Sequence, residues 1–197
     1  MKKAKIIFPL LFLIFSSSLF AQNFFTFGGA IDLSFNCDEE VIKEVGYFFP
    51  KTGLHCGFHF FNDNSKIGFY ADGEAVLSYQ EDCFCLGLSS LIGPTFLLET
   101  GDESGFLISP GLSAGAVLGY FSSEKPKAEG TLGQLFLGIG NKITYFFESG
   151  FSLGLNLAYH PLMNIYRSET KQDITKKFNK IENSFSVGIF IGMTDWF

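Results

Sequence analysis

The sequence predicts an all-β chain that forms a transmembrane, antiparallel, up-and-down β-barrel of about eight strands. Of its 197 residues 47% are hydrophobic and only 17% are charged, and the 26 Phe and 22 Gly are unusually many for a soluble domain. Beyond the N-terminal region no run of 18 apolar residues occurs, which excludes membrane-spanning helices. Apolar residues instead alternate with small or polar ones over segments of roughly ten residues, the length of a tilted membrane-spanning strand.

The N-terminal residues have the three parts of a secretory signal peptide. Three lysines precede an apolar run at residues 6–15, which is too short to span a bilayer as a helix. Small residues follow this run, so cleavage is expected after Ser18 or after Ala21. We therefore expect residues 1–21 to be removed and residues 22–197 to form the barrel as one domain.

The period-two pattern first appears at residues 25–35, where the odd positions are mostly Phe, Ile and Leu. The same pattern recurs at residues 54–60, 67–79, 84–98, 106–120, 135–145, 151–159 and 185–193. Successive side chains of a strand point to opposite faces. Each predicted strand therefore has one apolar face and one face of Gly, Ser, Thr and a few charged residues.

The connections between these segments alternate in length. Short turns are predicted at residues 62–65, 101–105 and 148–150, and longer polar loops at residues 36–51, 122–130 and 164–184. Outer-membrane barrels have short periplasmic turns and longer extracellular loops. Only the connection at residues 80–82 is short at a place where a longer loop is expected. Aromatic residues gather near the strand ends, as they do at the two interfaces of a membrane.

The period alone does not say which face is outside, because a secreted soluble barrel of the lipocalin type has its apolar face inside. The polar face here carries too few charges for a soluble exterior, so we expect the apolar face to contact lipid. In hydrocarbon every backbone polar group needs an internal partner, which requires a closed sheet. Pro94 and Pro110 lie on apolar faces and remove hydrogen-bond donors, and we expect one local bulge to accommodate both.

The last predicted strand carries Ile189, Ile191 and Met193 at alternate positions, and the sequence stops at Phe197. With its signal peptide, strand number and loop asymmetry, the chain resembles small outer-membrane barrels of the OmpA, OmpX and OmpW type. The resemblance implies that these four residues are the signal read by the barrel-assembly machinery, although Asp195 departs from the usual pattern. It also implies periplasmic chaperones and outer-membrane lipids as partners, and the outer membrane as the location.

The polar faces of the strands hold the candidate site. An eight-stranded barrel has a lumen narrow enough to be filled by side chains, and charges buried there must pair. The residues expected to form a polar cluster in this lumen are Asp32, His55, Asp72, Glu74, Lys142 and His160. A self-satisfied polar core is the simpler interpretation, and a polar gate or a proton-sensitive pore is the alternative.

No metal or other cofactor is expected from the sequence. His55 and His59 share a face but lie roughly 13 Å apart at the rise of a strand, too far to bind one ion. Cys83 and Cys85 are closer together but lack convincing partner ligands. Disulfide pairing among the four cysteines stays open, because an exported protein meets an oxidising space while Cys56 is expected to face lipid.

The formal net charge of −6 argues against nucleic-acid binding, which needs clustered Lys and Arg. We expect a non-catalytic barrel with a structural or surface role, or with a narrow passage for small or lipophilic solutes. One alternative is an adhesin that binds partners through its long loops, above all residues 164–184. Another is a lipid-modifying enzyme, but no G-x-S-x-G motif occurs and no His is expected beside a Ser. The oligomeric state stays open.

Overall fold

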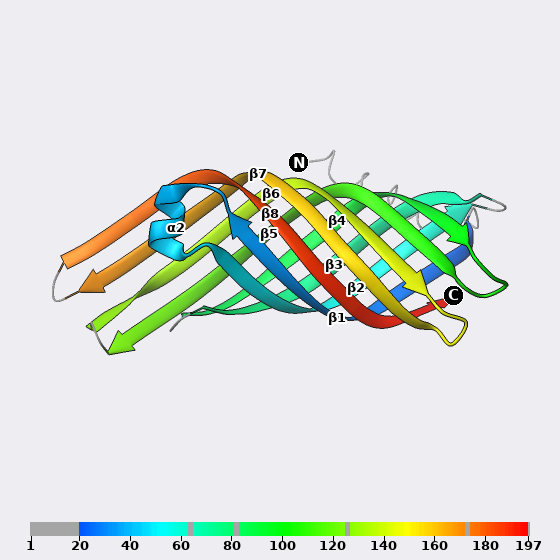
Figure 1. Ribbon diagram of the computed structural model, residues 1–197, viewed down its shortest axis with the longest axis horizontal. Coiled ribbons are helices and arrows are strands. Elements are labelled where there is room, and N and C mark those ends of the chain that lie inside the picture. Colours follow the sequence, from blue (N-terminus) through cyan, green and yellow to red (C-terminus); the bar gives the residue numbers. More distant parts are fainter. Residues whose placement is uncertain (1–19, 63–64, 81–82, 125–126, 172–173, 197) are drawn as a thin grey trace, which may run out of the picture.

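The computed structural model describes residues 20–62, 65–80, 83–124, 127–171 and 174–196, and the strands form one closed barrel in chain order (Figure 1). The elements are β1 (Phe20–Asn36), α2 (Glu39–Val45), β2 (Phe48–Asn62), β3 (Ile67–Gln80), β4 (Cys83–Glu99), β5 (Gly105–Glu124), β6 (Lys127–Phe146), β7 (Phe151–Lys171) and β8 (Ile174–Trp196). Every neighbouring pair is antiparallel, and β1 closes the ring against β8. The predicted fold class and strand number are confirmed. The predicted signal peptide lies outside the described residues except for its last two positions, which begin β1.

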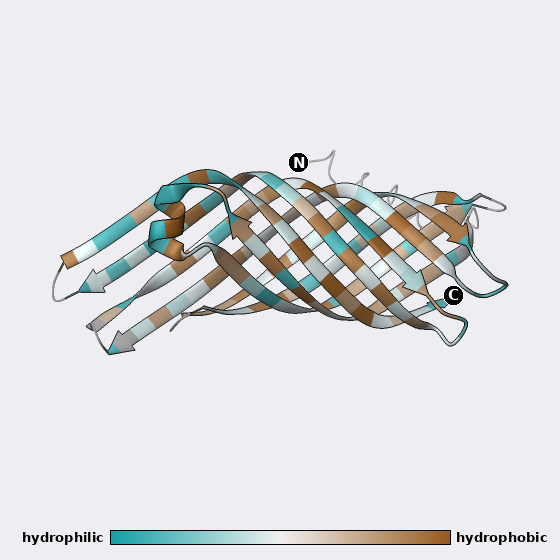
Figure 2. Cartoon of the chain, in the orientation of Figure 1, coloured by the Kyte–Doolittle hydropathy of each residue, from teal (hydrophilic) through white to brown (hydrophobic). Residues whose placement is uncertain are grey.

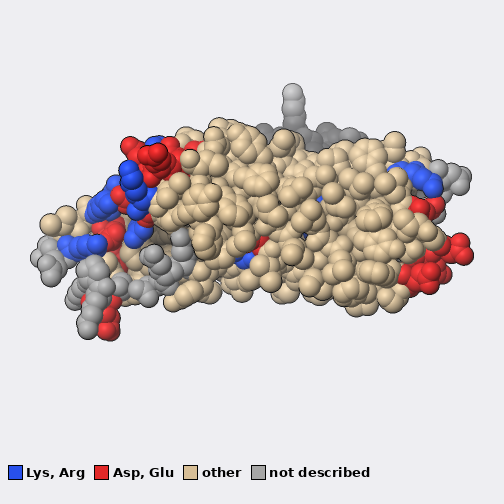
Figure 3. Space-filling view, viewed as in Figure 1, with Lys and Arg blue, Asp and Glu red and all other residues tan. Residues whose placement is uncertain are grey.

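The apolar faces of the strands point outward, as predicted. Leu118 on β5 is 69% exposed, whereas Val117 beside it is 1% exposed and points into the barrel. Hydrophobic and hydrophilic residues alternate along the strands in Figure 2, and Figure 3 shows a broad surface almost free of charge between two charged ends. An exterior of this kind suits acyl chains and not water, so the lipocalin-like alternative is wrong.

Two segments expected to be loops are strand instead. Residues 122–124 belong to β5 and residues 127–130 to β6, and the two strands stay paired as far as Glu124 and Lys127. Residues 164–184 belong mainly to β7 and β8, which stay paired as far as Lys171 and Ile174. These hairpins extend past the rest of the barrel at the end where α2 lies (Figure 1). Strands that leave the membrane have no lipid-facing side, so they lose the apolar alternation by which the sequence revealed the others.

The bulge predicted at Pro94 and Pro110 is absent. Ile92 faces Leu112, and four residues further along both strands the pairing of β4 with β5 resumes in the same register. The ladder is interrupted beside the two prolines, but no residue is inserted. The lost donors therefore cost ladder hydrogen bonds and leave the register intact.

An inserted residue occurs on β7 instead, at Pro161. The register shifts there against both neighbours, between Leu137 and Ile139 on β6 and beside His160 and Met163 on β7. Pro161 cannot donate to a ladder, and a bulge is one of the few places where a strand accepts it. The bulge reverses the alternation, so Met163 and Ile165 point inward although Tyr159 points outward.

The lumen is closed at both ends by apolar side chains. Five buried residues form what we call the turn-end plug, near the short turns: Phe24, Phe61, Leu97, Leu107 and Phe146. Val41 and Val45 of α2 join strand residues in a second apolar cluster, the mouth plug, at the end with the long hairpins. The predicted polar cluster lies between the two plugs. Within the described residues, no helix is both long and apolar enough to cross a membrane.

Candidate functional site

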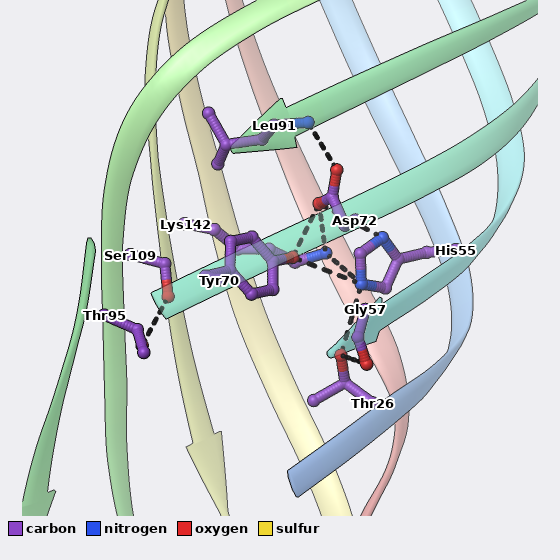
Figure 4. A network of polar contacts seen from close by, with 9 residues as sticks. All are labelled: Thr26, His55, Gly57, Tyr70, Asp72, Leu91, Thr95, Ser109 and Lys142. Carbon is purple, nitrogen blue, oxygen red and sulfur yellow. Dashed lines mark hydrogen bonds and ion pairs between the residues drawn. The ribbon is translucent and has the colours of Figure 1, made fainter. Parts of the chain in front are cut away.

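The polar side chains between the two plugs form a layer across the lumen, which we call the polar layer. Its centre is formed by Lys142, His55 and Asp72, three of the six predicted residues (Figure 4). The Lys142 ammonium lies 2.7 Å from His55 Nε2 and 3.9 Å from Asp72 Oδ2. An ammonium can only donate, so Nε2 accepts, and the proton of a neutral imidazole then sits on Nδ1, which lies 3.6 Å from Asp72 Oδ2. The ammonium also lies 4.5 Å from the centroid of the Phe190 ring. The buried cation thus has three stabilising neighbours.

Asp72 also connects this centre to the barrel wall. Its carboxylate accepts hydrogen bonds from the Tyr70 hydroxyl at 2.6 Å and from the Leu91 backbone N–H at 2.5 Å. The β3–β4 ladder is interrupted beside Asp72, between the pairs at Ala71 and Glu74. The carboxylate therefore replaces a missing strand partner at this point. Tyr70 was not among the predicted site residues; its place on the inward face, two residues before Asp72, was the available signal.

The other three predicted residues, Asp32, Glu74 and His160, line a cavity of about 80 Å³ together with Lys51. Lys51 faces Asp32 across the β1–β2 ladder. Sequence reasoning missed Lys51 because it placed this residue at the end of a loop. Gly188 on β8 makes the room, since a Cβ there would overlap the Asp32 carboxylate.

His160 lies beside a serine, contrary to the prediction. The Ser113 hydroxyl and His160 Nε2 are 3.1 Å apart, and the Phe136 ring packs on the imidazole with its centroid at 4.7 Å. The two residues are 47 positions apart and meet only because β5, β6 and β7 pair in this register. In many hydrolases a serine in contact with a histidine acts as the nucleophile, and the histidine acts as its general base. Among the described residues, however, no carboxylate forms an ion pair with His160 to orient it.

Hydroxyl groups also lie beside histidine nitrogens in the lumen. His59 Nδ1 lies 3.1 Å from the Thr95 hydroxyl, which lies 2.9 Å from that of Ser109. The Thr26 hydroxyl lies 3.3 Å from His55 Nε2. In the part of the chain that is described, no three His, Cys, Asp or Glu side chains are grouped to hold a metal ion. This arrangement favours a polar core that is largely satisfied by its own side chains, although Glu74 Oε1 is buried without a hydrogen-bond partner.

Beyond the membrane-spanning part of the barrel, ion pairs hold α2 on the β7–β8 hairpin. Lys180 donates to Asp38 at 2.9 Å and to Glu40 at 2.6 Å, and Lys176 donates to Glu44 at 2.5 Å. The hydrogen bond from Lys180 lowers the pKa of Asp38, and the bonds to Glu40 and Asp38 raise the pKa of Lys180. The sequence contains a signal for α2, although the segment was predicted to be a loop. Asp38 caps its N-terminus by accepting from the backbone N–H groups of residues 40 and 41, ahead of two valines four residues apart.

The predicted assembly residues Ile189, Ile191 and Met193 lie on the outer face of β8, 58%, 53% and 62% exposed. Phe197 lies outside the described residues, so the assembly signal stays a prediction. The four cysteines are free. Cys56 points outward, as expected, whereas Cys83 and Cys85 are buried inside the barrel.

A closed ring of eight antiparallel strands, an apolar outer belt and a filled polar lumen together define a small bacterial outer-membrane β-barrel protein. The chain is similar to the crystal structure of Neisserial surface protein A, NspA, with a TM-score of 0.52 and 12% identity over 89% of this chain and 97% of that one. Ail, the attachment invasion locus protein of Yersinia pestis, matches with a TM-score of 0.44 and 12% identity, over 87% of this chain and 98% of Ail. A major outer membrane protein from Thermus thermophilus matches with a TM-score of 0.44 and 10% identity, over 89% of this chain and all of that one (100%). No family model and no curated protein matches the sequence.

Proposed function

We propose that the protein is a non-conducting, non-catalytic barrel that binds an external partner at the cell surface through the sheet that extends from its mouth. The observation that carries this proposal is the contrast between a filled lumen and a protruding sheet. A lumen that is closed at both ends stabilises the barrel but conducts nothing, whereas a sheet that extends beyond the membrane belt offers a surface for binding a partner.

The filled lumen argues against a narrow passage for solutes. Phe24 and Phe61 of the turn-end plug are both fully buried, and their ring centroids are 5.7 Å apart in an edge-to-face contact. The cavity of about 80 Å³ beyond them holds only a few water molecules. The β1–β8 seam is paired from Phe24 to Asn36 on β1, so it offers no lateral opening.

The protruding sheet is made of β5, β6, β7 and β8. Pairing of β8 with β1 ends at Ser184, whereas pairing of β8 with β7 continues to Ile174. Among the described residues, positions 174–183 of β8 therefore have no strand on their other side. Such an edge can pair with an extended segment of another protein. Two of its three lysines, Lys176 and Lys180, are paired with acidic residues of α2, and Lys177 is exposed. An acidic segment therefore suits this edge better than a second copy of this chain, and it would replace α2 as the partner of these lysines.

Single-channel recording tests the closed lumen. We expect the full-length chain, folded into planar bilayers, to show no stepwise conductance across the pH range that titrates histidine and carboxylates. Stepwise conductance in the wild-type chain would overturn the closed lumen and support the narrow-passage function.

Shortening one hairpin tests the binding surface. Deleting residues 166–179 rejoins β7 to β8 at the facing pair Ile165 and Lys180. We expect cells that display the wild-type chain to adhere to at least one of a panel of immobilised extracellular proteins, and this adhesion to be lost with the shortened β7–β8 hairpin. The matched control deletes residues 122–129 of the β5–β6 hairpin, between the facing pair Phe121 and Gly130. Adhesion that is absent, or that survives the first deletion, contradicts the proposal.

The Ser113–His160 contact supports a second candidate, a hydrolase or acyltransferase. It is disfavoured because the pair lies between the two plugs and His160 has no acidic partner among the described residues. A fluorophosphonate probe reacts with activated serines and distinguishes the two functions. We expect no labelling of the folded chain; labelling that Ser113→Ala abolishes would show a catalytic serine.

A further inference from the structure

Two cysteines lie side by side inside the mouth plug, where neither the polar layer nor the protruding sheet uses them. Cys83 and Cys85 are two residues apart on β4 and both point inward, with their sulfur atoms 3.4 Å apart. Cys83 is 7% exposed and Cys85 is fully buried. Both are free thiols in the same apolar cluster as Val41 and Val45 of α2.

The facing strand leaves room for both sulfur atoms at one point. Gly119 on β5 is paired with Cys85. A Cβ at Gly119 would overlap the Cys85 sulfur and would lie 3.1 Å from the Cys83 sulfur. The two thiols therefore converge on a position that only glycine leaves open.

Two cations lie close to the thiols. The Lys51 ammonium lies 4.8 Å from the centroid of the Phe136 ring and 5.8 Å from that of Phe49, and both rings belong to the mouth plug. Arg167 is held in place by the ring of Phe121, 4.9 Å away, and Phe121 is the strand partner of Cys83. Negative charge on this sulfur pair would thus be compensated within a largely apolar cluster.

A disulfide suits this position poorly. Alternate residues of a strand have their Cα atoms about 6.6–6.8 Å apart, given the rise per residue. Disulfides span Cα separations of roughly 4.4–6.8 Å, so this pair is at the upper limit and its disulfide would be strained and easily reduced. A bridging metal ion needs no direct sulfur–sulfur bond and tolerates the wider spacing.

The donor set points to a soft monovalent ion. Zinc in structural sites takes four ligands, and the described residues hold no group of three His, Cys, Asp or Glu. Thiolate and thioether sulfur select Cu⁺ among biological metals, and a monovalent ion of this type accepts two sulfur ligands. The thioether of Met163 belongs to the same cluster and is a further soft donor.

We propose that Cys83 and Cys85 form a dithiolate binding site for a soft monovalent metal ion, Cu⁺ or its redox-inert analogue Ag⁺. On binding, each thiol releases its proton to solvent and each sulfur forms one bond to the ion, without any transfer of electrons. The resulting complex carries one negative charge, which Lys51 and Arg167 offset. The site lies under α2, which places it on the extracellular side of the barrel.

Competition with a chromogenic chelator tests the proposal on the full-length chain, folded in detergent, reduced and kept without oxygen. We expect the wild-type chain to withdraw one Cu⁺ from the Cu⁺–bicinchoninate complex, and Ag⁺ to displace it. Cys83→Ser and Cys85→Ser should each abolish this binding. The matched control, Cys37→Ser with Cys56→Ser, should bind as the wild type does.

A second variant separates the site from the mere presence of thiols. Gly119→Ala keeps all four cysteines but fills the space on which Cys83 and Cys85 converge, so we expect it to bind Cu⁺ at least tenfold more weakly. Gel mobility of unboiled samples confirms that each variant folds. The proposal is wrong if the wild-type chain cannot compete with the chelator, or if the Cys83→Ser/Cys85→Ser double variant still binds. It is also wrong if the pair oxidises in air to a disulfide that mild reductants leave intact, because the thiols would then be a structural crosslink.

Discussion

The two ends of the lumen are closed in different ways. The turn-end plug consists only of side chains from membrane-spanning strands, and Phe24 at its centre packs against Phe61 and Phe146 with ring centroids 5.7 and 5.4 Å away. The mouth plug depends on α2, a short helix outside the barrel wall. Four side chains of the β7–β8 hairpin hold α2 there: Lys176, Lys180, Arg167, which donates to the Glu44 carbonyl, and Glu182, which accepts from the Asp38 N–H.

The turn-end plug is therefore part of the barrel fold itself, whereas the mouth plug is completed by a helix that is docked onto the barrel. The turn-end plug cannot open without moving strands whose backbone hydrogen bonds have no alternative partner in lipid. The ion pairs of α2 involve partly or fully exposed side chains that water and salt screen, so each contributes little. We therefore expect damage at the turn end to weaken the whole barrel, and damage at the mouth to release α2 alone.

The largest effect is expected from Phe24→Ala. Removing this fully buried ring leaves a cavity in the turn-end plug and should lower the free energy of unfolding by about 3–5 kcal/mol. Urea unfolding of the chain in lipid vesicles measures this change. Phe27→Ala, on the lipid face of the same strand, is the control and should cost much less. Equal losses at the two positions would contradict the assignment of Phe24 to a structural plug.

The polar layer between the two plugs should show the next largest effect. Asp72→Asn keeps the shape of the side chain but removes the charge that faces Lys142, Tyr70 and the Leu91 N–H. Hydrogen bonds to charged groups contribute about 1.5–3 kcal/mol, so we expect a loss of about 2–3 kcal/mol in the same unfolding experiment. Asp102→Asn, in an exposed turn, should change little. A loss as small as that of this control would mean that the polar layer does not stabilise the barrel.

At the mouth, Val45→Ala should act locally. Val45 is 6% exposed and packs into the mouth plug, so removing its two methyl groups should favour opening of α2 by about 1 kcal/mol. Trypsin cleavage after Lys43 reports this opening and should accelerate several-fold. The unboiled barrel should keep its mobility in detergent gels, since strand pairing is unaffected. A global loss of the folded band would show that α2 is integral to the barrel.

The smallest effect is expected from pH. The bond from Lys180 lowers the pKa of Asp38, so the stabilisation is present above the ordinary pKa of an aspartate and is lost as the pH falls through the lowered value. Hydrogen exchange of the α2 amides, corrected for its intrinsic pH dependence, should therefore accelerate in acid. Lys180→Met should remove most of this pH dependence. An unchanged dependence in that variant would assign the effect to other carboxylates.

The sequence by itself determined the barrel, the number of strands and the face that each membrane-spanning residue occupies. In a membrane every outward residue must be apolar, so the fold is recorded at alternate positions and can be read from segments such as residues 25–35. For the same reason the six candidate lumen residues could be assigned to the inner face. The constraint ends at the membrane surface, which explains why the long hairpins and α2 were read as loops.

The tertiary structure alone decided which inward side chains meet. Lys142 contacts His55 from 87 positions away, and this contact depends on the register of every intervening strand. The inserted residue at Pro161 illustrates the point, because it reverses the faces of the residues after it on β7. A period-two pattern fixes the face of a residue but carries no information on its height relative to other strands. Contacts across the lumen are set by the sum of registers around the closed ring, and only the folded barrel defines that sum.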